Sequence, residues 1–234
     1  YVFNEKTALR MNVMAEYSET ADRDYTNSQR WGLFPTLTFG MNTDLEINFN
    51  YLHQQEDNIP DLGIPFYFGA PAPVNRSTFY GYADFDYEKT QVDIVTNRVK
   101  WNIDSAVTLT NSLRYGNESR SQSPTAPRLG AGTINTPQAN LTVTRSKPTS
   151  DRDYQNITDQ SDFLITAKTW DLSHTVNTGI EIAWETFDQT NYSISNNPPA
   201  NFLYPNTYQS TPIKGGVSGS SSTDTNSQAF YIQD

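Results

Sequence analysis

Apolar and polar residues alternate along several stretches of the chain, most strictly over residues 45–51. Between Leu45 and Tyr51 every odd-numbered side chain is apolar, and every even-numbered one is charged or an amide. The odd-numbered side chains are also mostly apolar over residues 7–17 and 31–39. Strict alternation has the period of a β-strand with one apolar and one polar face. The sequence therefore predicts strands in all three stretches, with the odd-numbered residues on the apolar face.

Further strands are expected along the rest of the chain. The apolar side chains of 95–103 and 107–115 again share a face, apart from Asn97 and Asn111. Residues 163–170 also read as a strand, although the alternation leaves its apolar face ambiguous. A strand over 176–184 and a last one beginning near Gln228 bring the expected total to about eight.

Short turns alternate with long polar segments between these strands. The turns are expected at 40–44, 104–106 and 171–173, and the loops at 18–30, 54–90, 117–161 and 188–227. Short turns at one end of a sheet and long loops at the other are typical of a transmembrane β-barrel. A strand of about ten residues, tilted by about 45°, is long enough to cross the hydrocarbon core of a membrane.

The composition agrees with a sheet that has only one apolar face. The 234 residues include 35% hydrophobic ones and no cysteine, and the mean hydropathy is −0.66. Disorder would also lower the apolar content, but 14 Tyr, 12 Phe and 4 Trp argue against it. No run of residues approaches the roughly 20 apolar positions of a spanning helix. The net charge of −10 makes nucleic acid an unexpected partner.

Several short motifs, taken in order, resemble the TonB-dependent ferric-siderophore receptors of bacterial outer membranes, and most closely their catecholate-type branch. The motifs are Arg30–Pro35, Tyr51–His53, Asp57–Pro65, Arg76–Gly81, Leu113–Gly116, Thr125–Arg128, His174–Thr175 with Gly179–Glu181, and Phe230–Asp234. Each motif is weak alone, whereas their common order along nearly the whole chain is specific.

The resemblance implies an all-β fold, an antiparallel meander that forms part of a 22-stranded transmembrane barrel with short periplasmic turns and long extracellular loops. Residues 1–234 would supply about the third to the tenth strand. The N-terminal plug and the segment that contacts TonB would lie outside this chain. The implied function is energy-coupled uptake of a ferric siderophore, the transported ligand, across the outer membrane. The implied partners are that siderophore, outer-membrane lipid and TonB.

Candidate ligand-binding residues follow from the chemistry of such a ligand. A ferric siderophore is bulky, often anionic and ring-bearing, so aromatic faces and Arg donors should meet it. The resemblance places Phe66 and Tyr67 on a ligand-facing loop. It gives Thr125–Arg128 where some hydroxamate receptors carry paired aromatics, which favours Arg128 as the anion contact.

Arg76 and Tyr80 are two further candidates on the same loop. Four of the five candidates also have a structural explanation. Phe66 and Tyr67 would pack the loop, Arg76 would pair with Asp84 or Asp86, and Tyr80 would be structural.

The sequence contains no motif that indicates an enzyme or a resident metal. His53 and His174 are expected at opposite ends of the barrel, so they cannot share a metal ion. The acidic residues Asp151, Asp153, Asp159 and Asp162 have no EF-hand spacing, and a solvated acidic segment explains them better. Neither an enzyme activity nor a cofactor is therefore expected.

Two other classes of protein remain open at this point. A general outer-membrane porin would also combine alternating strands with a charged lumen. A secreted carbohydrate-binding β-sandwich would use Tyr and Trp as sugar platforms. The barrel is favoured over the sandwich because sandwich loops are rarely as long as those expected here.

Overall fold

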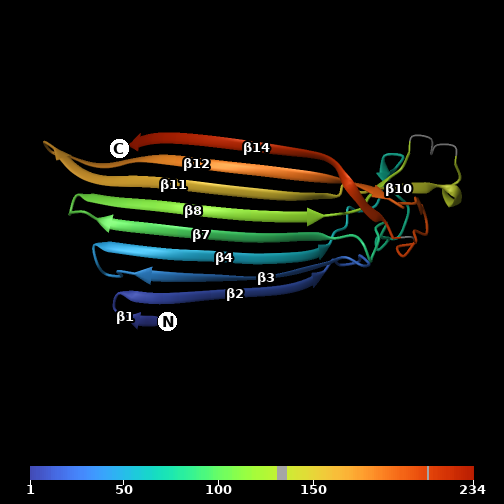
Figure 1. Cartoon of the computed structure of the whole chain (residues 1–234), viewed down its shortest axis with the longest axis horizontal. Coiled ribbons are helices and arrows are strands. Elements are labelled where there is room, and N and C mark those ends of the chain that lie inside the picture. The colour runs from blue at the N-terminus through green and yellow to red at the C-terminus, as the bar shows by residue number, and fades with distance from the viewer. Residues whose placement is uncertain (131–135, 210) are drawn as a thin grey trace.

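One long antiparallel sheet dominates the chain in a computed structural model that describes residues 1–130, 136–209 and 211–234 (Figure 1). The nine strands lie in the order β1-β2-β3-β4-β7-β8-β11-β12-β14, so each long strand pairs with its neighbours in the chain. Their bounds are β1 Val2–Asn4, β2 Thr7–Glu19, β3 Asn27–Phe39, β4 Leu45–Ile59, β7 Glu88–Asn102, β8 Val107–Gln122, β11 Ser150–Thr169, β12 Leu172–Ser195 and β14 Ile213–Gln233. The all-β antiparallel meander predicted from the sequence is confirmed.

The three expected tight turns lie together at one end of the sheet (Figure 1). Gly40 has φ +73°, a left-handed conformation that glycine adopts without steric cost, and an added Cβ would collide with the carbonyl of Leu45. In the β7–β8 turn the Asp104 carboxylate accepts hydrogen bonds from the backbone N–H groups of Ala106 (2.7 Å) and Val107 (2.9 Å). Local turn chemistry therefore fixes how these hairpins are connected.

The two faces of the sheet follow the alternation in the sequence. Directly opposed residues of an antiparallel pair share a face, and the register aligns Leu9 with Leu37 and Leu37 with Phe49. On the other face Thr38 donates to the Asn48 side chain (2.6 Å), which in turn donates to Glu46 (2.9 Å). The apolar odd-numbered residues thus share one face, and Glu46 and Asn48 lie on the opposite one. That the apolar face contacts lipid stays a prediction.

Pairing also resolves the strand whose apolar face was ambiguous. Phe163 lies opposite Leu109, so Phe163 belongs to the apolar face. The same register puts three polar residues of that face side by side. The Asn111 amide donates to Asp159 (2.6 Å) and to the Ser161 hydroxyl (2.9 Å). The break in the pattern at Asn111 is therefore matched by polar partners on the next strand.

The strands extend further toward the long loops than the sequence predicted. Strand β4 continues to Ile59 and β8 to Gln122, which leaves loops at 60–87 and 123–149. The expectation of a loop over 188–227 was wrong, because β12 reaches Ser195 and β14 already begins at Ile213. The Gly/Ser-rich run at 215–222 is therefore a strand, which alternation could not reveal because its side chains form no apolar face. Strand β1 was also missed.

The short β1 and the long β14 form the two edges of the nine-stranded sheet. In a search confined to the described residues, no helix has the length and apolar character needed to cross a membrane. Residues 131–135 and 210, which belong to predicted loops, lie outside the described part of the chain.

Candidate functional site

The loops at the open end of the sheet pack together into one structure, which we call the loop cap: residues 60–87, 123–149 and 196–212, as far as they are described. Its strands are β5 Phe66–Tyr67, β6 Ala70–Pro71, β9 Ala126–Arg128, β10 Thr142–Ser146 and β13 Ala200–Asn201. Strand β10 pairs with both β9 and β13, so it joins the second loop to the third (Figure 1). The buried apolar core of the cap is Ala72, Tyr80, Leu141, Val143, Ala200 and Phe202.

Phe66 and Tyr67 form one strand of a small hairpin with β6. Phe66 is 71% exposed, whereas Tyr67 packs against the core with its ring 5.3 Å from that of Phe202. Phe68 and Gly69 turn the hairpin with positive φ values of 51° and 80°. Phe66 is thus available to a ligand, while Tyr67 mainly supports the hairpin.

Arg128 ends β9 and is exposed. Its neighbour Leu129 packs against the same core as Tyr67, so the second loop and the hairpin of Phe66 belong to one packed unit. This agrees with the expectation that the loops after β4 and β8 lie together at one rim. The roles of Phe66, Tyr67 and Arg128 in binding stay predictions.

Tyr80 and Arg76 occupy different environments in the first loop. Tyr80 is 1% exposed, and its hydroxyl donates to the carbonyl of Phe202 (2.6 Å). Burial raises the pKa of Tyr80 to about 12. Arg76 is exposed, and its carbonyl accepts a hydrogen bond from Arg23, which also pairs with Asp61. The packing favours the structural alternative for Tyr80, and a ligand contact by Arg76 remains a prediction.

A buried ion pair that the sequence did not predict joins the first loop to the second. The Lys147 ammonium lies 2.6 Å from the Asp86 carboxylate, and their side chains are 1% and 0% exposed. Lys147 also donates to the Ser123 carbonyl (3.0 Å) and the Thr125 hydroxyl (3.1 Å). Burial raises the pKa of Asp86 and lowers that of Lys147, because both charges lose water. Asp86 therefore pairs with Lys147 rather than with Arg76.

A buried arginine joins the second loop to the third. The Arg145 guanidinium lies 4.2 Å above the Tyr82 ring and donates to the Asn206 carbonyl (2.6 Å). The amide of Asn197 donates to the Arg145 carbonyl (2.5 Å). These partners lie 52 to 63 positions apart in the chain, and local sequence patterns carry no signal for such pairs.

Exposed aromatic residues of the cap were also missed. Phe68 is 63% exposed, Tyr204 is 81% exposed and Tyr208 is 62% exposed. The Tyr208 ring lies 5.9 Å from that of Tyr25, in the loop between β2 and β3. Phe68 directly follows Phe66 and Tyr67, and Tyr204 follows Phe202 and Leu203, so aromatic residues within the long loops were the available signal.

Neither histidine belongs to a metal centre within the described residues. His53 lies 2.7 Å from Asp93, and His174 lies 2.7 Å from Asp234. Across the described ranges, no group of three or more His, Cys, Asp or Glu side chains is placed to hold a metal ion.

Comparisons with known proteins identify the class of this fold. The Catecholate siderophore receptor Fiu of Escherichia coli (strain K12) is 31% identical over 245 residues, which cover 96% of this chain and 32% of that receptor. The Probable TonB-dependent siderophore receptor PiuA of Acinetobacter baumannii is 27% identical over 82% of this chain and 26% of its own length. The chain thus spans about a third of the length of the first curated relatives it matches. No protein-family model matches.

Solved structures agree. The open form of the ferric-catecholate import receptor Fiu from E. coli superimposes with a TM-score of 0.85 at 30% identity, over 99% of this chain and 38% of that one. PiuA from A. baumannii gives a TM-score of 0.86 at 23% identity, over 98% of this chain and 36% of that one, and shows the shared fold. The chain is homologous to TonB-dependent siderophore receptors of the bacterial outer membrane, so the resemblance is confirmed. The porin and sandwich alternatives are not favoured.

Proposed function

We propose that this chain forms part of an outer-membrane receptor that takes up a ferric siderophore of the catecholate type. The observation that carries the proposal is the 31% identity to a catecholate siderophore receptor across 96% of the chain. The chain would supply a section of barrel wall and part of the ligand-binding mouth. It acts as a receptor and not as an enzyme, and its partners are the ferric siderophore, outer-membrane lipid and, through the plug of the whole receptor, TonB.

The loop cap is the proposed ligand-binding part. Phe66 offers an exposed ring, and Arg128 offers an exposed guanidinium for a negatively charged iron complex. Both residues lie on segments that pack against one buried core, so the protein presents them on a preformed support. Preorganised contacts lose less conformational entropy on binding than contacts from free loops.

Replacement of Arg128 tests the ligand contact. A hydrogen bond to a charged group contributes about 1.5–3 kcal/mol, so Arg128→Ala in the whole receptor should weaken ferric-catecholate affinity by about 10- to 100-fold. The measurement is a titration of purified receptor, with gel heat-modifiability as the control for folding.

Arg98→Ala is the matched control, since Arg98 is also exposed but lies in β7 near the turn end of the sheet. Equal affinities of the Arg128 variant and the unchanged receptor would remove Arg128 from the site. If Phe66→Ala and Tyr67→Ala also left the ferric-catecholate affinity unchanged, the site would have to lie outside this chain's loops.

A further inference from the structure

Four polar side chains interrupt the apolar face of the sheet on strands β7, β8 and β11. They are Asn97, Asn111, Asp159 and Ser161, and we call them the polar cluster. The Asn111 amide donates to Asp159 (2.6 Å) and to Ser161 (2.9 Å). Asp159 is exposed, and the buried Oδ1 of Asn97 has no hydrogen-bond partner within the described residues. The face therefore carries a carboxylate and an amide whose hydrogen bonding is incomplete.

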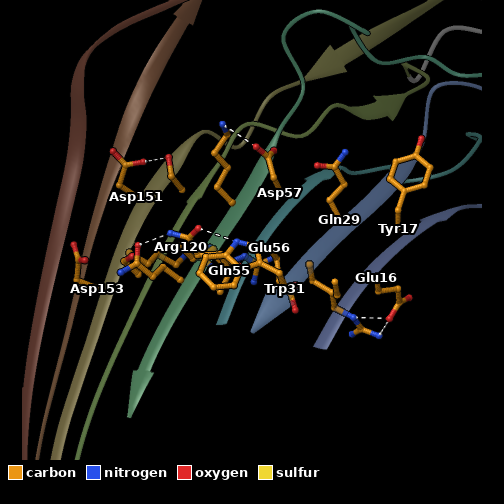
Figure 2. Close-up of a pocket in the computed structure, with 18 residues that line it drawn as sticks. Glu16, Tyr17, Gln29, Trp31, Gln55, Glu56, Asp57, Arg120, Asp151 and Asp153 are labelled. Carbon is orange, nitrogen blue, oxygen red and sulfur yellow. Dashed lines mark hydrogen bonds and ion pairs between the residues drawn. The ribbon is translucent and has the colours of Figure 1, made fainter. Parts of the chain in front are cut away.

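The register places the polar cluster inside the apolar band. The row of cross-strand partners on its turn side contains Leu45, Trp101, Leu109 and Phe163. The row on its loop side contains Tyr51, Val95, Tyr115, Ile157 and Trp184. Further toward the loops both faces are polar, with Glu56 on one face and with Gln55 and Asp153 on the other (Figure 2). With the apolar face in contact with lipid, as predicted, the cluster lies at the level of the hydrocarbon.

A carboxylate at this depth is costly unless other polar groups meet it. Lipid tails form no hydrogen bonds, and ionisable side chains in a membrane usually face protein or a water-filled cavity. Asn111 bonds Oδ1 of Asp159, which leaves acceptor capacity at Oδ2. Strands β7, β8 and β11 already have both neighbours in the sheet, so further strands of the same barrel cannot cover this face. The missing donor must therefore come from another molecule.

The polar cluster is arranged so that it can pair with itself. Asn97 and Asp159 belong to one row of partners, and Leu113 of β8 lies between them. Adjacent strands are about 4.8 Å apart, so the amide and the carboxylate lie at similar distances on either side of β8. Two receptors inserted in the same direction are related by a two-fold axis along the membrane normal, which joins residues of equal depth. An axis beside β8 sets Asn97 of each copy against Asp159 of the other.

We propose that the polar cluster is the centre of a homodimer interface within the outer membrane. A second copy of the receptor is the occupant, because each carboxylate then meets an amide donor and Asp159 does not face itself. The two Leu113 side chains, each 45% exposed in one copy, meet at the axis and add apolar contact. A contact through three strands also suits the convex outer walls of two barrels. The inference rests on the predicted contact with lipid and not on the siderophore.

Dimer formation by the whole receptor in lipid vesicles tests the proposal, measured by single-molecule subunit counting over a series of lipid dilutions. The unchanged receptor should dimerise, and Asp159→Leu should weaken the dimer by about tenfold, since two hydrogen bonds between the copies are lost. Gel heat-modifiability checks that this variant folds. Asp153→Leu is the matched control and should dimerise normally, because Asp153 is an exposed carboxylate on the same strand and face but beyond the hydrocarbon.

Cross-linking in membranes locates the two-fold axis. This chain has no cysteine of its own, so Leu113→Cys introduces a single thiol into it. A short bis-maleimide should link two copies through position 113. Leu9→Cys is the control, because Leu9 belongs to the same row but lies on β2, four strands away, and it should give no linked dimer.

Four results would overturn the proposal: a monomeric unchanged receptor, an equally tight dimer in Asp159→Leu, the same loss in Asp153→Leu, or equal cross-linking from Leu9 and Leu113. Cross-linking of Leu113→Cys to a different protein in cells would also overturn it, since the occupant would then be another partner. The affinity of Asp159→Leu for a ferric catecholate should be unchanged. A failure of this inference is therefore distinguishable from a failure of the proposed function.

Discussion

Val13 in the sheet is 74% exposed, whereas Val143 in the loop cap is fully buried. Phe230 in β14 and Phe202 in the cap differ in the same way, at 74% and 0% exposure. The sheet presents its apolar side chains outward, as a wall that faces lipid would, while the cap encloses its own as a water-soluble domain does. One chain thus follows two rules of burial, and the rule changes between the long strands of the sheet and the loops that join them.

Ion pairs show the same contrast. In the sheet Lys89 and Asp57 lie 3.1 Å apart and are both 58% exposed, whereas the Lys147–Asp86 pair of the cap is almost fully buried. An exposed pair contributes little to stability, and the loss of one partner of a buried pair leaves an uncompensated charge. Variants of the two regions should therefore differ sharply.

The largest effect is expected from Lys147→Met. This variant leaves the Asp86 carboxylate buried without its cation, which should destabilise the cap by about 3–5 kcal/mol. Amide hydrogen exchange of residues 60–87 and 123–149 in the whole receptor measures the free energy of opening of the loop cap. The exposed counterpart Lys89→Met should change stability by less than about 1 kcal/mol.

A double variant, Asp86→Asn with Lys147→Met, separates charge from packing. It should recover much of the stability lost in Lys147→Met, because no unpaired charge remains buried. Equal exchange rates in Lys147→Met and Lys89→Met would contradict the distinction between the two regions.

The next effect concerns the two faces of the sheet. Ile180 lies on the apolar face and is 49% exposed, and Glu181 lies on the opposite face. Ile180→Arg should cost about 2–4 kcal/mol, since it places a charge in hydrocarbon, whereas Glu181→Arg should be tolerated. Urea unfolding of the whole receptor in lipid vesicles measures both. A larger loss in Glu181→Arg would invert the assignment of the faces.

The smallest effect is expected from Tyr80→Phe, which removes one buried hydrogen bond to the Phe202 carbonyl. The expected cost is about 1 kcal/mol in the same exchange measurement. The pKa of Tyr80 is about 12 in the folded cap, above the ordinary value of 10. Stability from the neutral phenol is therefore fully present below pH of about 10 and is lost as the pH rises through about 12.

Tyr80→Phe should lack this alkaline loss, so the difference between the two proteins should shrink above pH of about 10. If the stabilities of the two proteins fell in parallel at alkaline pH, burial would not be raising the pKa of Tyr80.

The sequence was informative where one rule governs a whole segment. Alternation over Leu45–Tyr51 predicted a strand and its faces, since a strand that borders lipid needs an apolar residue at every second position. A strand that extends beyond the hydrocarbon no longer needs an apolar residue at every second position. The run at 215–222 forms part of β14 and contains only Gly, Ser and Val. Backbone pairing to β12 holds it, so no side-chain pattern marked it.

The candidate site was less predictable, for a different reason. Phe66 and Arg128 could be proposed because their chemistry suits the ligand and a family resemblance gave their place. The contacts that build the cap join Asp86 to Lys147 and Tyr80 to Phe202, which are 61 and 122 residues apart. Such pairs depend on the folded topology, and a single sequence contains no local record of them.

Iron uptake by cells that carry the whole receptor as their only catecholate receptor tests the central claim most directly. We predict uptake of a ferric catecholate complex that stops when TonB is removed and falls in Arg128→Ala at limiting ligand concentration. Uptake that continues unchanged without TonB, or none for any ferric catecholate tested in cells that display the folded receptor, would contradict the account.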